Sequence, residues 1–473
     1  MWLEFWEYSL LLAYAVIVIG TAAVILLENR QPAKTIAWLL VLICIPVIGW
    51  VFFYFFGQNV RKERHLHKRN FQILTHLMHT AKQHQPSHEI PEEYATLISA
   101  MRRHKGAFPT SGNELHLLES GAAFIIALLR ALRSAQHHVH IETYIFSNDA
   151  VGRLVRDALT DCAKRGVEVR LIYDDVGCWN VPTRFFEQMQ QDGIQAEAFL
   201  PVRFPSLTSK VNYRNHRKIC IIDGVEGFIG GMNIANRYVS RRKGRWTDLQ
   251  LHIKGPAVGA LQRTFLTDWH IVAGALITEQ TYFPHCDTQN QKGLLQIIDG
   301  TPVSQYPEIE FGLVWIAMHA KHYLYLQTPY FIPTEPMLNA LQVAAISGTD
   351  VRIMVPRRTD VFWLRRANDS YFSDLLKAGV RVFTYSSGFL HSKSAVADNS
   401  WCSVGSSNID FRSFENNFES NAFVYDADTA LKMRDIFLRN QQACEEIVLE
   451  KWRKRPLMQR CVESLTRIVA PLL

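Results

Sequence analysis

Two uninterrupted apolar runs mark the amino-terminal end of the chain. The first covers residues 8–27 and the second covers residues 35–56, and neither contains a charged side chain. Each run has about 20 residues, the length that a helix needs to cross a hydrocarbon core of ~30 Å. The first run is too long for the apolar part of a signal peptide and lacks a clear small-residue cleavage site. We therefore expect two retained helices that form a hairpin in a membrane.

Basic residues gather on one side of this hairpin. The link between the two runs carries only Arg30 and Lys34, whereas the chain just after the second run carries Arg61, Lys62, Arg64, Lys68 and Arg69. Cytoplasmic segments next to a membrane carry an excess of Lys and Arg. This bias predicts that the amino terminus and everything after the second run face the cytoplasm, where the basic stretch can contact acidic headgroups.

Beyond the basic stretch, one hydrophobic pattern occurs twice. A β-branched run, a segment with helical spacing and a second β-branched run follow one another at 135–146, 151–165 and 167–175, and again at 320–333, 336–348 and 350–356. Each strand–helix–strand unit predicts parallel strands joined by a right-handed crossover. We expect an α/β protein with two tandem copies of one domain, related by pseudo-twofold symmetry and preceded by the membrane hairpin.

These patterns divide the chain into five parts. We predict two transmembrane helices, a basic juxtamembrane connector, a first domain, a second domain and a basic amphipathic tail, at 1–60, 61–105, 106–290, 291–446 and 447–473. The tail mixes a basic cluster with spaced Leu, Ile and Val residues. An interfacial amphipathic helix and a terminal helix packed on the second domain both fit this pattern.

The composition of the chain indicates the charge of its partner. The 473 residues are 48% hydrophobic and 20% charged, and the formal net charge is +7. This charge suits an anionic partner, either a nucleic acid or an acidic lipid surface. The eight cysteines are scattered without a C-x-x-C pair, and the His-rich patches have no standard metal spacing. The sequence thus gives no metal signal and favours a reduced compartment.

Each copy of the repeat continues into the same polar motif. The skeleton H-x-K-x4-D, then six residues, then G-[GS]-x-N, occurs with His216, Lys218, Asp223 and Asn233, and again with His391, Lys393, Asp398, Ser406 and Asn408. About 0.07 matches to H-x-K-x4-D are expected by chance in a chain of this composition. Two complete copies with one spacing therefore indicate a function.

The residue types of the motif suit an anionic group. On a strand, a His and a Lys two positions apart project from one face, so both can reach one small anion. Lys supplies a compact positive charge and Asn an amide donor, and a Gly pair allows the backbone to approach the same oxygens. Each Asp stands between two apolar runs, where we expect it to fix a hairpin turn.

Paired motifs of this kind on a duplicated α/β unit resemble the phospholipase D superfamily. The resemblance implies that both motifs meet in one active site and that the reaction proceeds in two steps without a metal or another cofactor. His216 would attack phosphorus as the nucleophile, and His391 would act as general acid and then as general base.

The resemblance also assigns the remaining site residues. Its catalytic set comprises His216, Lys218, Asp223, His391, Lys393 and Asp398, together with the acids Asp248 and Glu419, each of which would orient the His of the opposite half. Phosphate binding falls to Lys218, Asn233, Lys393, Asn408 and Ser406. By analogy alone, His216 is taken as the nucleophile, since the two motifs are too similar to decide it.

Further stretches resemble the bacterial cardiolipin synthases within that superfamily, among them NYRNHRKICIIDG, LQTPYFIPTEPML and FRSFENNFESN. That likeness implies an enzyme of the bacterial inner membrane, with cytoplasmic catalytic domains and the bilayer as its partner. It would move a phosphatidyl group from one phosphatidylglycerol to another and release glycerol.

Three other functions fit parts of the sequence. A membrane-bound phospholipase D could use water as acceptor or take phosphatidylethanolamine, because the motifs do not specify the acceptor. A tethered nuclease agrees with the positive charge but not with the two apolar runs, so we expect no nucleic acid partner. An inactive scaffold disagrees with two complete motifs. The sequence leaves the oligomeric state open, a homodimer included.

Overall fold

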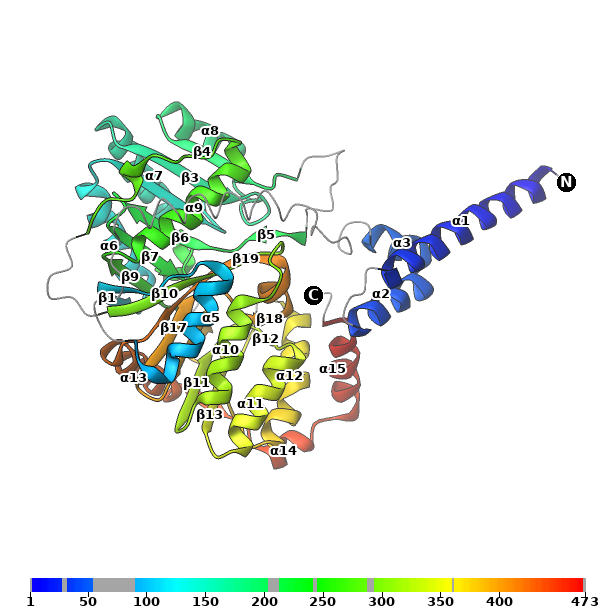
Figure 1. Ribbon diagram of the computed structural model, residues 1–473. Coiled ribbons are helices and arrows are strands. Elements are labelled where there is room, and N and C mark those ends of the chain that lie inside the picture. Colours follow the sequence, from blue (N-terminus) through cyan, green and yellow to red (C-terminus); the bar gives the residue numbers. More distant parts are fainter. Residues whose placement is uncertain are drawn as a thin grey trace.

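The computed structural model describes residues 2–27, 32–53, 90–202, 212–240, 245–286, 293–359 and 361–470. The basic stretch at 61–69 and most of the expected connector lie outside these residues. Figure 1 shows a two-part body with the amino-terminal helices projecting from one side.

One mixed sheet of sixteen strands runs through both parts of the body. The first half contributes β1 (Thr110–Leu118), β2 (His138–Thr143), β3 (Glu168–Asp174), β4 (Gln195–Phe199), β5 (Arg214–Asn215), β6 (Lys218–Ile222), β7 (Glu226–Gly230) and β9 (Gln250–Lys254). The second half contributes β10 (Gly293–Gly300), β11 (Tyr323–Gln327), β13 (Asp350–Pro356), β14 (Arg381–Tyr385), β16 (Ser394–Ala397), β17 (Trp401–Gly405), β19 (Asn417–Val424) and β20 (Cys444–Glu446). The antiparallel pair β1–β10 joins the halves at the centre.

The strand order confirms the duplication. Outward from the centre, the first half reads β1-β9-β7-β6-β2-β3-β4 and the second reads β10-β19-β17-β16-β11-β13-β14, with β20 added at the edge. The helices repeat in the same order: α6 (Gly121–Ser134), α7 (Ala150–Lys164), α8 (Thr183–Gln191) and α9 (Val258–Ala273), then α10 (Glu308–His319), α11 (Glu335–Ile346), α12 (Phe362–Lys377) and α13 (Ala427–Gln441). The halves are thus two copies of one α/β unit, as predicted.

The sheet is mixed, and the parallel strands expected for each strand–helix–strand unit form only part of it. The predicted strand–helix–strand units give the parallel pairs β2–β3 and β11–β13. The motif strands β6 and β16 instead pair antiparallel with β2 and β11. Each motif forms a hairpin, β6–β7 or β16–β17, and a tight turn can join only antiparallel strands.

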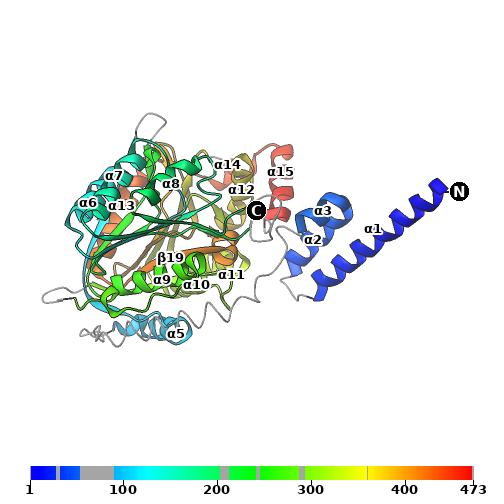
Figure 2. The same cartoon turned by 90° about the horizontal axis from the view of Figure 1, so that it is seen from above.

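Three apolar cores join the helices to the sheet. Helices α6, α7 and α8 pack on one face of the first half, and α10, α11 and α12 pack on the second half together with α5 (Ala95–Lys105). A third core, with residues of α9 and α13, draws on strands of both halves, among them Ile219, Leu295 and Val404. The view in Figure 2 shows the helices on both sides of the sheet. The halves therefore share one interior at the centre.

The amino-terminal runs form α1 (Trp2–Leu27), α2 (Pro32–Cys44) and α3 (Pro46–Phe52). The second expected helix is broken at Ile45, because Pro46 has no backbone N–H and its ring excludes a continuous helix. Within the part of the chain that the structure describes, no helix has both the length and the apolar character needed for a bilayer crossing. The expected transmembrane hairpin thus stays a prediction.

The motif aspartates fix hairpin turns. Asp223 and Asp398 have φ angles of 54° and 50°, and Gly224 and Asn399 beside them also have positive φ. The Asp223 carboxylate accepts three backbone N–H groups, those of Gln136, His137 and His138, at 2.8–3.0 Å. The Asp398 carboxylate does the same for Lys321, His322 and Tyr323. Each carboxylate thereby ties its turn to the start of β2 or β11.

Loss of either carboxylate should destabilise the fold. Asp223→Ala leaves three N–H groups without their acceptor and places Ala at a left-handed φ, so we expect the free energy of unfolding to fall by about 2–4 kcal/mol. Denaturant unfolding of the purified protein measures this change. Asp157→Ala, at an exposed carboxylate on α7, is the matched control and should change stability by less than about 0.5 kcal/mol. Equal stability of the two variants would contradict the proposed role of the turn.

Candidate active site

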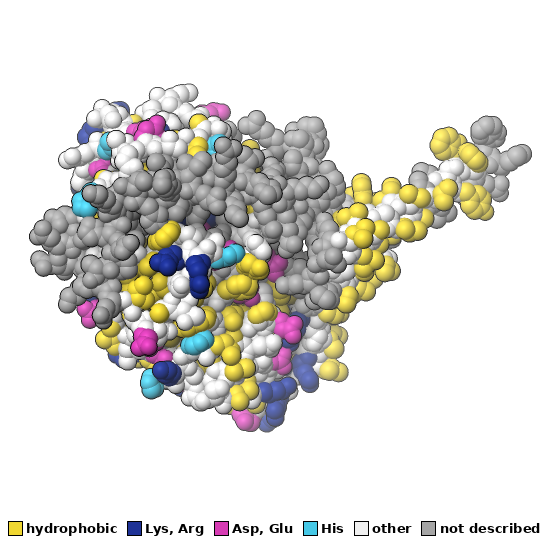
Figure 3. Space-filling view, viewed as in Figure 1, with side chains coloured by type: hydrophobic (Ala, Val, Ile, Leu, Met, Phe, Trp, Pro, Cys, Tyr) yellow, Lys and Arg dark blue, Asp and Glu magenta, His cyan; other side chains and the backbone are white. Residues whose placement is uncertain are grey.

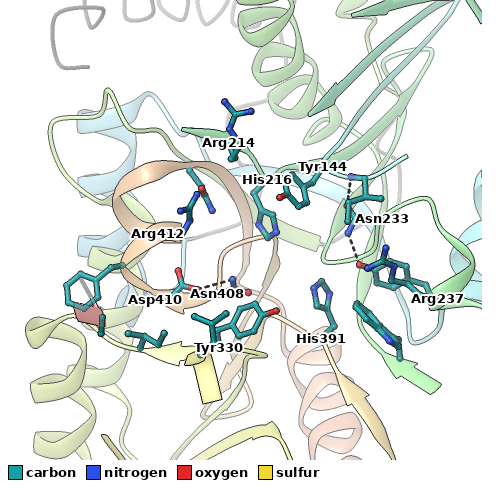
Figure 4. A pocket seen from close by; sticks show the side chains of 18 residues that line it. Tyr144, Arg214, His216, Asn233, Arg237, Tyr330, His391, Asn408, Asp410 and Arg412 are labelled. Carbon is teal, nitrogen blue, oxygen red and sulfur yellow. Dashed lines mark hydrogen bonds between the residues drawn. The ribbon is translucent and has the colours of Figure 1, made fainter. Parts of the chain in front are cut away.

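Both motif histidines point into one cavity between the halves. The cavity has a volume of about 300 Å³, and His216 and His391 lie on its wall. Figure 4 shows the two rings directed into it from opposite halves. Its other polar wall residues are Tyr144, Arg214, Asn233, Arg237, Tyr238, Trp246, Tyr330, Asn408, Asp410, Arg412 and Asn417.

Backbone bridges between the halves place the two histidines. The short strand β5 (Arg214–Asn215) pairs in parallel with β19 of the other half, and His216 N–H then donates to the Phe418 carbonyl at 2.9 Å. In the same way, β15 (Gly388–Leu390) pairs with β8 (Arg245–Thr247), and His391 N–H donates to the Thr247 carbonyl at 2.8 Å. The histidines therefore precede the motif strands β6 and β16, and do not stand on them as we expected.

Each histidine meets an acid of the opposite half. His216 Nδ1 lies 3.0 Å from Glu419 Oε1, and His391 Nδ1 lies 2.7 Å from Asp248 Oδ2. Both acids are fully buried, so water does not compete for these contacts. The contacts occupy Nδ1 of each ring, which leaves Nε2 as the nitrogen available to a molecule in the cavity.

The two lysines lie behind the histidines. Lys218 Nζ donates to the His216 carbonyl and Lys393 Nζ to the His391 carbonyl, both at 2.5 Å. Both side chains are buried, and neither belongs to the cavity wall. Burial, which outweighs the attraction of Glu419, lowers the pKa of Lys218 well below its usual value.

The Gly-Gly and Gly-Ser pairs approach protein atoms, which corrects the expectation that they open space for phosphate. A Cβ on Gly231 would overlap the Asp248 carboxylate. At the equivalent position, the Ser406 hydroxyl donates to Glu419. Both copies thus use the second residue of the pair to seat the acid that contacts the opposite histidine.

The motif asparagines line the cavity, and their side-chain amides already make hydrogen bonds within the protein. Asn233 accepts from the Ile145 N–H at 3.0 Å and donates to the Tyr238 hydroxyl at 2.6 Å. Asn408 donates to Asp410 at 3.1 Å. The motif aspartates Asp223 and Asp398 are not on the cavity wall. Their position thus does not support a place in the catalytic set, but it does support the expected role in the hairpin turns.

Arginines on the cavity wall were missed at the sequence level. Arg237 and Arg412 both follow the motif asparagine by four residues, so the repeat extends to N-x3-R in each copy. That constant offset was the signal that could have revealed them. Arg214 adds a third guanidinium from β5. Together they make the cavity suitable for an anion.

The two histidine–acid pairs differ in their proton affinity. Burial lowers the pKa of His216 to about 4 despite Glu419, and burial together with Lys393 lowers the pKa of His391 well below its usual value. Burial raises the pKa of Asp248 to about 7. Although burial acts in the same direction on Glu419, His216 and Lys218 keep its pKa below the ordinary value. At neutral pH, Glu419 is ionised and Asp248 is partly protonated.

Comparison with known proteins places this geometry in a family. The family described as "Cardiolipin synthase, PLD-like domain" matches residues 128–269 and 314–440, and "Phospholipase_D-nuclease N-terminal" matches residues 11–58. A cardiolipin synthase of Alkalihalophilus pseudofirmus is 38% identical over 98% of this chain and 93% of its own length. The major cardiolipin synthase of Bacillus subtilis is 36% identical over 95% of this chain and 96% of its own.

Solved structures show the same fold at low identity. The phosphatidylserine synthase of Haemophilus influenzae superposes with a TM-score of 0.58 at 15% identity, over 76% of this chain and 95% of that one. Taken with the relatives that match nearly the whole length, the duplicated unit and its paired motifs establish that this chain belongs to the phospholipase D-like family of cardiolipin synthases.

Proposed function

We propose that this enzyme transfers a phosphatidyl group from one phosphatidylglycerol to a hydroxyl of another, giving cardiolipin and glycerol. The observation that carries the proposal is the pair of buried histidine–acid contacts that cross between the halves at one cavity. The relatives named cardiolipin synthases support the choice of substrate.

His216 is the nucleophile in this scheme. The ionised Glu419 accepts the Nδ1 proton of His216, so the neutral ring presents the lone pair of Nε2 to the cavity. Nε2 attacks phosphorus and the bond from phosphorus to the glycerol oxygen breaks. The phosphatidyl group is then held on His216 while glycerol leaves.

His391 carries the proton in both steps. A protonated Asp248 donates to His391 Nδ1, so the neutral ring presents N–H at Nε2 to the cavity. As this N–H protonates the departing glycerol oxygen, the Asp248 proton moves to Nδ1, so the ring stays neutral and Asp248 becomes a carboxylate. In the second step, Nε2 takes the proton of the acceptor hydroxyl and the Nδ1 proton returns to Asp248, while the hydroxyl oxygen attacks phosphorus and the bond to His216 breaks.

The phosphate is held by the cavity arginines in this proposal. Arg237 and Arg412 face it from the two halves, and Asn233 and Asn408 line the same cavity. Lys218 and Lys393 do not contact the phosphate in this scheme, because each ammonium donates to the carbonyl of its histidine. They act on the phosphate from behind the histidines through their positive charge. Ser406 supports Glu419 and does not reach the phosphate directly.

The amino-terminal helices are proposed to anchor the enzyme in the bacterial inner membrane, with the catalytic halves in the cytoplasm. Large apolar side chains on α1 are exposed, among them Phe5, Trp6, Leu12 and Ile19. Figure 3 shows apolar side chains gathered along this projecting part. The proposal also rests on the two apolar runs of the sequence and on the basic residues after them.

Membranes containing the enzyme should convert labelled phosphatidylglycerol to cardiolipin and free glycerol, as seen by thin-layer chromatography. His216→Ala and His391→Ala should each lower the rate by at least about 10³-fold, since each histidine acts in both steps. The two variants separate the roles. With substrate labelled in the phosphate, His391→Ala should accumulate label on the protein and His216→Ala should not. Formation of phosphatidic acid would identify water as the acceptor and overturn the transferase.

Asp248→Asn should stabilise the protein while impairing activity. The folded-state pKa of Asp248, about 7, lies above the ordinary value of 3.8, so its ionisation costs stability as pH rises through this window. Asparagine removes this cost, and we expect a gain of about 2–4 kcal/mol in unfolding free energy at pH 8 and little change at pH 4. Glu419→Gln is the matched comparison. Its depressed pKa predicts the opposite sign at pH 8, and equal signs would contradict the assigned proton positions.

Reporter fusions should report the orientation of the anchor. A reporter inserted between residues 27 and 32 should face the outside, and one fused after residue 473 should stay in the cytoplasm. Sodium carbonate washing should leave the full chain in the membrane pellet. Release of the protein into the wash would show that the helices do not cross the bilayer.

A further inference from the structure

The carboxy-terminal helix α15 (Leu457–Val469) turns its apolar side outward. Leu457, Met458, Leu465 and Ile468 are 73%, 76%, 65% and 53% exposed, and Cys461 is exposed between them. At 3.6 residues per turn, these five positions fall within about 100° of the helix circumference. They form one continuous stripe, called here the outer stripe.

Polar side chains hold the inner side of α15 against the body. Glu463 and Thr466 are buried, and Glu463 pairs with Arg455 at 2.8 Å. Arg467 pairs with Asp374 of α12 at 2.8 Å. A surface helix of a globular protein normally packs its apolar face inward. The reversed arrangement fixes α15 by ion pairs and leaves its apolar face for an apolar environment outside the chain.

The carboxy-terminal end of α15 reaches the active-site cavity. Ala470, two residues after Ile468, belongs to the cavity wall, as does Leu364 of α12. Figures 1 and 2 both show α15 on the side of the body that faces α2 and α3. The stripe, the cavity and the proposed anchor therefore share one side of the molecule.

Charge around the stripe selects among apolar environments. Residues 449–470 carry six basic residues, Lys451, Arg453, Lys454, Arg455, Arg460 and Arg467, against two acids, Glu450 and Glu463. The one acid within α15, Glu463, is buried in its ion pair. Basic residues flanking an apolar stripe fit an anionic lipid surface. A second copy of the chain would bring the same positive charges together across the contact.

We propose that the outer stripe of α15 inserts into the interfacial region of an anionic bilayer and holds the cavity entrance against the leaflet. A lipid then enters the cavity from the leaflet with its acyl chains still in apolar surroundings. The entry of lipid from the leaflet rests on the proposed function, whereas insertion of the helix is measured without any lipid turnover.

Insertion is measured with a probe on the natural cysteine of the stripe. The full-length protein with Cys44→Ser, labelled at Cys461 with an environment-sensitive fluorophore, is reconstituted in vesicles of phosphatidylcholine and phosphatidylglycerol. We expect a blue-shifted emission and strong quenching by lipids with a shallow acyl-chain spin label. A label at Gln188→Cys on the exposed side of α8, in a Cys44→Ser and Cys461→Ser background, is the matched control and should stay unquenched.

Introducing a negative charge into the outer stripe tests what insertion does. Leu465→Glu and Ile468→Glu should abolish the quenching and lower turnover of bilayer phosphatidylglycerol by roughly tenfold or more, since lost apolar burial and headgroup repulsion act together. Turnover of a short-chain phosphatidylglycerol dispersed as monomers should stay within about twofold. Ser464→Glu, next to the stripe on the same helix, should leave quenching and both activities near wild type.

The outcomes separate this inference from the proposed function. Quenching at Cys461 without any lipid turnover supports insertion and contradicts the transferase. Turnover with an unquenched Cys461 label overturns insertion and leaves the transferase standing. Self-quenching between labels with a dimer on light scattering, both lost in Leu465→Glu, would assign the stripe to a second copy and also overturn it. Equal losses on short-chain and bilayer substrates would show that the stripe supports folding of the site instead.

Discussion

Each motif histidine contacts a buried carboxylate supplied by the other half. His216 receives its backbone acceptor and its acid from β19, and His391 receives both from the segment that contains β8 and ends at Asp248. Neither half can therefore place its own histidine. The duplicated unit functions only as a pair, and the central strands β1 and β10 with the shared core fix that pair rigidly.

A buried charge network supports this exchange from beneath. Arg217, between His216 and Lys218, pairs with Asp268 of α9 and donates to the Ser420 hydroxyl of β19 at 3.0 Å. Ser420 in turn donates to Asp299 of β10. Removal of one partner from such a network leaves an uncompensated charge, which is costly in a low dielectric. The network thus couples the backbone of the first motif to the strand that carries Glu419.

Local sequence patterns predicted the features that local forces determine. The repeat gave β2, α7 and β3 and their counterparts, because β-branched runs and helical spacing are short-range signals. The turn position of Asp223 followed from its place between two apolar runs. The opposite-half contacts of Asp248 and Glu419 came from the family resemblance alone, since pairs 143 and 203 residues apart leave no local trace.

What the sequence missed depends on how strands stack in space. The Gly pair was expected at phosphate, yet Gly231 faces Asp248, because the neighbouring strand β9 approaches it. The lysines turned out to lie behind the histidines, since each histidine precedes its strand and each lysine donates to the histidine carbonyl. Arg237 and Arg412 were visible as a constant offset but carry meaning only once the cavity places them on opposite walls.

In the proposed scheme, near-identical motifs take opposite roles because their surroundings differ. The carboxylate beside His216 is stabilised as an anion by Lys218, by its contact with His216 Nδ1 and by the Ser406 hydroxyl, whereas Gly231 provides no such donor for Asp248. At neutral pH the Asp248 carboxyl is therefore partly protonated, whereas the Glu419 carboxyl is ionised. The single difference between Gly-Gly and Gly-Ser in the two motifs lies at the contact with these acids. Together with burial and the neighbouring side chains, the extra donor at this position favours the base and the acid that the proposed scheme needs on the two sides of the phosphate.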